Sequence, residues 1–131
     1  MATAAPNQEA TVFVVDDDDA VRESLVFLMK SIGLKAESFP SAQAFLDSYN
    51  AARAGCLVLD IRMPGMSGLE LQDKLIQMGS ILPIIFITGH GDVPMAVKAI
   101  KAGAADFVQK PFRDQELIDR IREVLEEDSH A

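Results

Sequence analysis

The chain has 131 residues, 49% of them hydrophobic, and a net charge of −8, which suits one domain with its own core and disfavours direct binding to a phosphodiester backbone. No segment is apolar over the length of a membrane span, and the N-terminus lacks the order of a signal peptide. The single cysteine, Cys56, excludes an internal disulfide, so we expect a cytoplasmic protein in a reducing compartment.

The first predicted elements are a tail, a strand and a helix. Residues 1–10 lack a cluster of aromatic or β-branched residues and are predicted to be a disordered tail. Thr11–Val15 is predicted to be a strand; four aspartates follow it, and then apolar residues recur at helical spacing. Asp18 and Asp19 are placed to cap that helix and to compensate its dipole.

Four further strands are predicted, each followed by a helical segment: Leu34–Phe39, Gly55–Leu59, Pro83–Thr88 and Ala105–Val108. Ser41 can cap the second helix, and Ser67 with Glu70 forms a capping box ahead of the third. The fourth helix is predicted at Val93–Ala102 and is opened by Asp92.

The order of these elements predicts the fold class. Apolar runs such as TVFVV, CLVL and PIIFI are typical of strands buried on both faces of a sheet. Strands alternating with helices indicate βαβ units. We therefore expect an α/β fold over residues 11–127: a doubly wound, five-stranded parallel sheet of order 2-1-3-4-5 with five helices. Residues 128–131 are predicted to be a tail or a truncated linker.

Polar residues recur where the predicted strands end. Asp16 and Asp17 follow the first strand, and Asp60 follows the third. Thr88 ends the fourth strand, and Lys110 comes shortly after the fifth. The carboxyl ends of parallel strands lie along one edge of the sheet, where open α/β sheets bind ligands. We therefore expect these five side chains to converge on one pocket.

Such a pocket would favour a divalent cation. Two carboxylates 4 Å apart repel each other by roughly 4 kcal/mol at an effective dielectric near 20, and oxygen ligands select Mg2+ or Mn2+. With the cation in place, Asp60 can act as the nucleophile towards a phosphoryl group and form an acyl phosphate. Lys110 can pair with one phosphoryl oxygen, and the Thr88 hydroxyl can donate to another.

Three longer segments carry a family resemblance: VVDDDDAVR at 14–22, LVLDIRMPGMSGLEL at 57–71 and IIFITGHGDVPMAVKAIKAGAADFVQKPF at 84–112. Together they resemble the receiver domains of bacterial two-component response regulators. The match covers about residues 11–125. The GHGDVPMAV segment is most similar to the FixJ-type regulators of the LuxR class, which normally carry a C-terminal DNA-binding domain.

The resemblance implies a role for each matching position. Asp60 matches the phosphoacceptor and Lys110 the phosphate-binding lysine. Thr88 matches the switch hydroxyl and Phe107 the switch aromatic. Pro111 follows Lys110 where the family usually has a cis peptide bond.

The resemblance also implies the ligands of an Mg2+ ion. Asp16 and Asp17 match the family's acidic pair, with Asp17 the more direct ligand and Asp16 partly water-mediated. Asp60 is the third carboxylate, and the backbone carbonyl of Arg62 matches the last protein ligand.

The function implied is phosphorelay signal transduction. A sensor histidine kinase would supply the phosphoryl group, and the domain would not be a turnover enzyme. Phosphorylation would control the formation of a homodimer through Val93–Ala102. It would also control a DNA-binding output domain, absent from this chain, that regulates transcription. The chain is thus either a stand-alone receiver or one cut before its output domain, and the FixJ likeness favours the second. No direct contact with nucleic acid or membrane is expected.

Two other functions remain open from the residues. A phosphatase of the haloacid dehalogenase type also uses a strand-end aspartate with Mg2+, but it needs a second acid where this chain has Arg62. A flavodoxin-like module that binds a nucleotide or flavin shares the fold. It would need a Gly-rich or Ser/Thr-rich phosphate loop after the first strand, where this chain has four aspartates.

Overall fold

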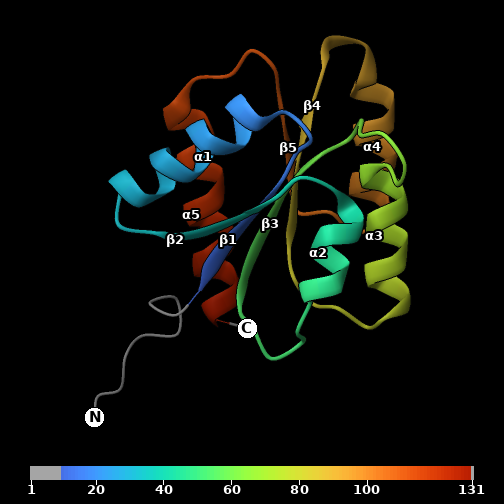
Figure 1. Cartoon of the computed structure of the whole chain (residues 1–131), viewed down its shortest axis with the longest axis horizontal. Helices are drawn as coiled ribbons and strands as arrows, with labels where there is room; N and C mark the ends of the chain where they lie inside the picture. Colours follow the sequence, from blue (N-terminus) through green and yellow to red (C-terminus); the bar gives the residue numbers. More distant parts are fainter. Residues whose placement is uncertain (1–9, 131) are drawn as a thin grey trace.

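A five-stranded parallel sheet lies between two layers of helices (Figure 1). The computed structural model describes residues 10–130, so residues 1–9 of the tail predicted at 1–10, together with residue 131, lie outside the described residues. Ala10, the last residue of that predicted tail, is buried in the core instead. The strand order is β2-β1-β3-β4-β5 with every pairing parallel, which confirms the predicted order.

The elements alternate along the chain as predicted. The strands are β1 (Thr11–Val15), β2 (Lys35–Phe39), β3 (Gly55–Asp60), β4 (Ile84–Thr88) and β5 (Asp106–Gln109). The helices are α1 (Asp19–Ser31), α2 (Ala42–Ser48), α3 (Gly68–Gln77), α4 (Val93–Lys101) and α5 (Asp114–His130), with a short 3-10 turn, η2 (His90–Asp92), leading into α4.

Several element ends differ by a residue from the prediction, and two of them have clear causes. Leu34 does not join β2, because its N–H donates to the carbonyl of Met29 as part of the end of α1. Pro83 has no N–H to give to the ladder, so β4 begins one residue later. At the other end of the chain, α5 continues to His130, past residue 127, where the domain was expected to end.

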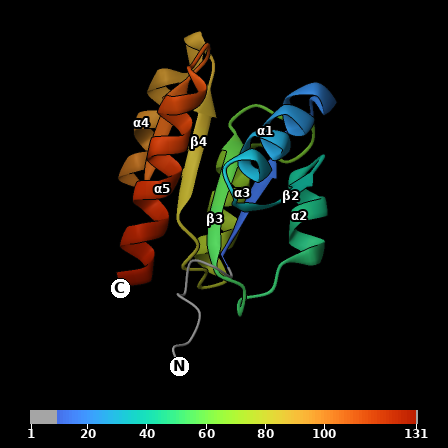
Figure 2. The ribbon, with the colours of Figure 1, turned by 90° about the vertical axis from the view of Figure 1, so that its left-hand side faces the viewer.

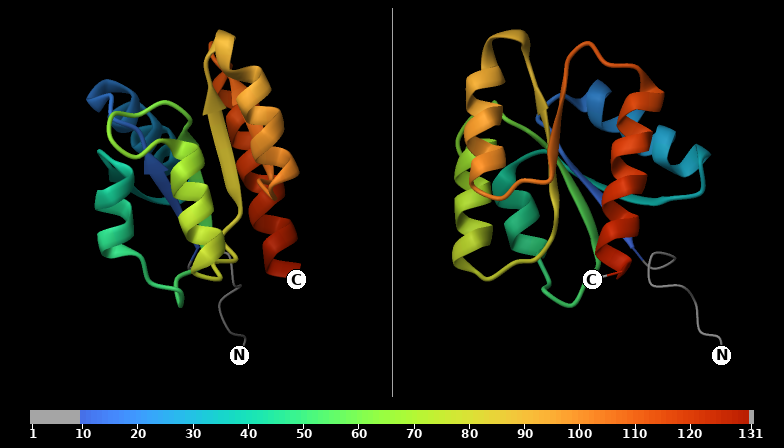
Figure 3. Two further views of the ribbon diagram at one scale, coloured as in Figure 1. Left: turned by 90° about the vertical axis from the view of Figure 1, so that its right-hand side faces the viewer. Right: turned by 180° about the vertical axis from the view of Figure 1, so that it is seen from behind.

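Two hydrophobic clusters form the core, one on each face of the sheet. Figure 2 shows α1 and α5 over one face, where Leu25 and Leu117 pack against alternate residues of the central strands. The left view of Figure 3 shows α2, α3 and α4 over the other, where Phe45, Leu71 and Ala96 do the same. The three central strands are buried on both faces, as their continuous apolar runs predict.

The caps predicted for the first and third helices are present. Asp18 accepts hydrogen bonds from the N–H groups of Ala20 and Val21 at the start of α1. Ser67 and Glu70 form the reciprocal capping box of α3. These caps fix where α1 and α3 begin, and therefore fix the two loops that follow β1 and β3. Among residues 10–130, no helix combines the length and hydropathy that crossing a membrane requires.

Candidate metal and phosphate site

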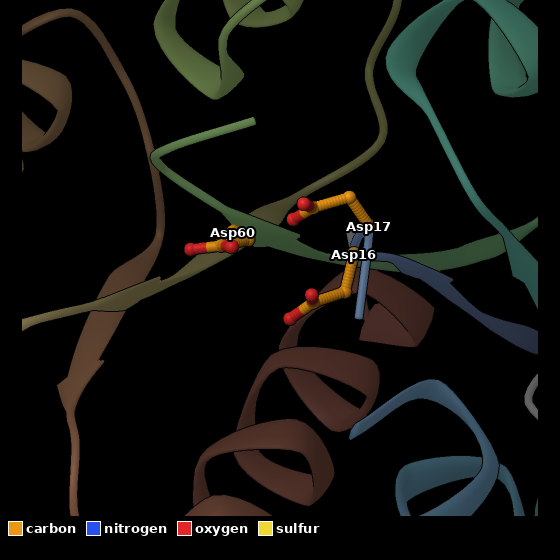
Figure 4. A group of neighbouring side chains, drawn as sticks. All are labelled: Asp16, Asp17 and Asp60. Atoms are coloured by element: carbon orange, nitrogen blue, oxygen red, sulfur yellow. The ribbon is translucent and has the colours of Figure 1, made fainter. Parts of the chain in front are cut away.

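Three aspartates meet at the carboxyl edge of the sheet. Asp16 directly follows β1, Asp17 comes next, and Asp60 is the last residue of β3. Because β1 and β3 pair in parallel with Val15 opposite Leu59, Asp16 and Asp60 leave the sheet side by side. One oxygen from each carboxylate lies within 4.8 Å of the other two, and Figure 4 shows the three side chains gathered at this edge and extending to the same side.

The carboxylate of Asp16 is only partly satisfied by the protein. Its Oδ1 accepts the N–H of Asp18 at 2.9 Å, whereas its buried Oδ2 has no hydrogen-bond partner among the described residues. Burial raises the pKa of Asp16, and the neighbouring Asp17 raises it further. Leaving a buried polar atom without a partner costs about 1 to 3 kcal/mol, so this oxygen is suited to act as a ligand of a cation.

Asp60 lies in an environment that disfavours its charge. Burial, followed by the negative charge of Asp16, raises the pKa of Asp60 to about 6 from its ordinary value of 3.8. The Lys110 ammonium and a hydrogen bond from the Arg62 backbone act in the opposite direction. A divalent cation among the three carboxylates would offset this repulsion, and an all-oxygen donor set fits a hard ion such as Mg2+.

The other two predicted pocket residues flank the aspartates. Lys110 follows β5, and its backbone N–H donates to the Thr88 carbonyl at 2.8 Å. Its positive charge partly offsets the rise that burial causes in the pKa of Asp16 and of Asp60. Thr88 ends β4, is fully buried, and donates its hydroxyl to the Gly89 carbonyl at 3.2 Å. The peptide bond from Lys110 to its proline is cis, as the family resemblance implied.

Phe107 lies on the strand next to the one that ends in Thr88. It is in β5, opposite Phe86 of β4 in the strand register. Its side chain is half-buried and packs against the hydrophobic cluster under α4. The ring therefore lies on the edge strand of the sheet, beside the strand that ends in Thr88.

Arg62 and Asp92 form a contact that the sequence did not reveal. Asp92 was predicted to open α4, but its carboxylate makes no capping hydrogen bond. Instead it accepts the Nε of Arg62 at 2.7 Å and 2.9 Å. The sequence shows an acidic residue ahead of a helix, which usually indicates a cap. A cationic partner 30 residues earlier is visible only in the folded chain.

Gly68, the first residue of α3, is a second feature that the sequence did not single out. A Cβ at this position would overlap the backbone carbonyl of Asp60 and lie 3.0 Å from the Cα of Ile61. Only glycine therefore allows α3 to start against the end of β3. The signal in the sequence was the glycine itself, directly after the capping serine, but its neighbour across the loop could not be read from it.

The comparisons with known proteins agree with this geometry. Residues 12–122 match the family described as the response regulator receiver domain. The chain belongs to this family. Response regulators are signalling proteins that receive phosphoryl groups from sensor kinases, so the family membership argues against both the flavodoxin-like module and the dehalogenase-type phosphatase.

Several relatives are similar over most of the chain. The response regulator protein TmoT of Ectopseudomonas mendocina is 56% identical over 119 residues, which are 91% of this chain and 54% of TmoT. The transcriptional regulatory protein FixJ of Azorhizobium caulinodans is 54% identical over 114 residues, 87% of this chain and 54% of FixJ. The chain thus spans about half the length of these relatives.

The fold is also that of a solved relative. The crystal structure of FixJ-N superposes with a TM-score of 0.84 at 49% identity, covering 89% of this chain and 94% of that one. The expected resemblance to FixJ-type receivers and the expected flavodoxin-like topology are both confirmed.

Proposed function

We propose that this domain accepts a phosphoryl group on Asp60 from a sensor histidine kinase and relays the change through α4 and β5. The observation that carries the proposal is the cluster of Asp16, Asp17 and Asp60 with its unpartnered buried oxygen, next to the ammonium of Lys110. A bound cation would relieve the repulsion among the three carboxylates, and a phosphoryl group would pair with the neighbouring lysine.

Asp16, Asp17, Asp60 and the backbone carbonyl of Arg62 would hold an Mg2+ ion, with Mn2+ as a substitute. When bound, the ion supplies positive charge that orients the phosphoryl oxygens and screens them from the carboxylates.

The groups of the chain itself then carry out the transfer. An oxygen of Asp60 forms a bond to phosphorus while the bond from phosphorus to the donor breaks, and the bonding electrons leave with the donor. Lys110 pairs with one phosphoryl oxygen. The Thr88 hydroxyl turns away from the Gly89 carbonyl and donates to a second phosphoryl oxygen.

The wider role follows from the longer relatives. FixJ of Azorhizobium caulinodans is named a transcriptional regulatory protein, and the matched region is 54% of its length. We propose that this receiver likewise controls a DNA-binding output domain in the full-length protein and that it acts in the cytoplasm. With a net charge of −8, the receiver itself would not contact DNA.

The direct test is chemical labelling. Purified protein with Mg2+ and acetyl phosphate should gain one phosphoryl group per chain, labile to base as acyl phosphates are, and peptide mapping should place it on Asp60. EDTA should prevent the labelling. Sustained hydrolysis of a generic ester such as p-nitrophenyl phosphate, without a stoichiometric label, would instead support a phosphatase.

We further propose that phosphorylation produces a homodimer through Val93–Ala102. Movement of Thr88 towards the phosphoryl group would free space into which Phe107 turns, repacking the surface of α4 and β5. On α4, Val97 is 43% exposed and Ile100 is 36% exposed. Two copies with equal negative charge do not attract one another, so a contact between them has to be apolar. The exposed apolar strip on α4 suits such a contact.

Replacing Val97 with glutamate should block the dimer and leave phosphorylation intact. The new carboxylate would be buried without a partner in the contact, so we expect dimer affinity to fall on the order of 100-fold. Sedimentation of the parent and Val97→Glu, each with and without beryllofluoride, measures this. Phe27→Glu likewise replaces an exposed apolar side chain with glutamate, but on α1, and should leave the dimer unaffected. Identical masses of the parent with and without beryllofluoride would contradict the dimer proposal.

A further inference from the structure

The ion pair between Arg62 and Asp92 is asymmetric in its exposure. The Arg62 side chain is 71% exposed, whereas the Asp92 side chain is only 9% exposed. The guanidinium holds the carboxylate through Nε at 2.7 Å and 2.9 Å and through a terminal nitrogen at 2.7 Å. Within residues 10–130, the bonds that the Asp92 carboxylate accepts come from Arg62. The buried partner therefore depends on the exposed one for its charge compensation.

This ion pair closes a path of contacts between two residues of the site. Arg62 follows Asp60 by two residues in the loop after β3, and its side chain holds Asp92. The N–H of Asp92 donates to the Gly89 carbonyl at 3.1 Å. The same carbonyl accepts the Thr88 hydroxyl at 3.2 Å. The loop after β3 is thus bonded through Asp92 to the turn before α4.

We propose that Asp92 is a positioning residue that couples the cation site to the start of α4. This inference rests on the proposed function, in which the Arg62 carbonyl is a metal ligand. Asp92 fixes the Arg62 side chain and so holds the loop that presents this carbonyl. A shift of this loop on cation binding would carry Asp92 along with Arg62, because a buried carboxylate without its partner is unfavourable. Asp92 directly precedes α4, so the helix start moves with it.

The far end of α4 has an anchor of its own. Gln72 of α3 is buried and donates its Nε2 to the Ala99 carbonyl of α4 at 3.0 Å. This contact holds α4 against α3 without passing through the loop after β3. Weakening it should loosen α4 and leave the cation site unchanged, which makes Gln72→Met a control for general destabilisation of the helix.

The experiment compares Mg2+ affinity and the behaviour of α4 in the same proteins. Isothermal titration gives the Mg2+ dissociation constant, and hydrogen exchange over 93–101 with and without Mg2+ reports the coupling. In Asp92→Asn, which keeps the side-chain volume, we expect about tenfold weaker Mg2+ binding, as for other residues that orient a metal ligand, and loss of the Mg2+ effect on α4. Arg62→Lys keeps the charge but loses the two-pronged contact and should show a smaller change in the same direction.

Two control variants complete the design. Gln72→Met should lower the melting temperature but keep the Mg2+ affinity of the parent. Glu37→Gln breaks another arginine–carboxylate pair, with Arg53, at the opposite edge of the sheet and should change neither reading.

The outcomes separate this inference from the proposal on which it rests. If the parent fails to bind Mg2+, the proposed cation site is wrong and the inference falls with it. If the parent binds Mg2+ and Asp92→Asn binds it equally well while its melting temperature falls as in Gln72→Met, the proposed function stands. Asp92 is then only a structural contact.

Discussion

Replacing Asp60 with asparagine should reduce labelling by acetyl phosphate from about one phosphoryl group per chain to none. A carboxamide does not form an acyl phosphate, and the variant nearly preserves the volume of the side chain. The neighbouring carboxylates are poor substitutes. Asp16 is buried and its Oδ1 is already bonded to the Asp18 N–H, while Asp17 is exposed to solvent.

Intact-mass spectrometry of Asp60→Asn with Mg2+ and acetyl phosphate measures this loss. Asp73→Asn, an identical change at an exposed position on α3, should label like the parent. The substitution also removes a proposed metal ligand, so peptide mapping of the labelled parent is needed to separate loss of the acceptor from loss of the ion. Full labelling of Asp60→Asn at another residue would show that Asp60 is not the acceptor.

The stability of the metal-free protein is expected to fall as the pH rises from about 4 to about 6. The pKa of Asp60 is raised from 3.8 to about 6, mainly by burial, so the folded state binds this proton more tightly than the unfolded chain. The cost of ionising Asp60 is therefore absent below pH 3.8 and complete above about pH 6. We expect a loss of about 1 to 2 kcal/mol in unfolding free energy, since solvent screens this half-exposed carboxylate.

Mg2+ should reverse this loss above pH 6. An ion that binds only the folded state adds about 2.7 kcal/mol when its free concentration is 100 times the dissociation constant. Asp17→Ala should lack this response, because it removes a proposed ligand. It should also stabilise the metal-free protein, because it removes one of three mutually repelling charges.

Urea denaturation from pH 4 to 8, in EDTA and in Mg2+ at matched ionic strength, measures both effects. Other carboxylates titrate in the same range, and the pKa of Glu37 is lowered by its bond to Arg53, which gives a pH dependence of the opposite sign. The difference between the parent and Asp60→Asn isolates the contribution of Asp60. Two results would contradict the charge balance proposed for the pocket. One is the same dependence of unfolding free energy on pH in the parent and in Asp60→Asn, and the other is a parent whose unfolding free energy does not change with Mg2+.

Local patterns in the sequence were enough to predict most of the fold and the meeting of the three aspartates at one edge of the sheet. Continuous apolar runs such as TVFVV could only be buried on both faces, and the amphipathic segments between them had to supply the covering helices. Once the strands are parallel, the residues that end them share an edge. Asp16, Asp60, Thr88 and Lys110 could therefore be assigned to one pocket from the sequence, because strand ends can be read locally.

The way in which that pocket is joined to its surroundings was decided by tertiary contacts alone. Asp92 reads as a helix cap, yet its carboxylate is bound by Arg62 from another loop. Gly68 reads as a residue of a capping motif, yet its missing side chain makes room for the Asp60 backbone. Hydrophobic period and capping preference act between residues a few positions apart, so they can be read along the chain. Which charge meets which, and where two backbones touch, depends on loops brought together by strand pairing, and no local pattern encodes it.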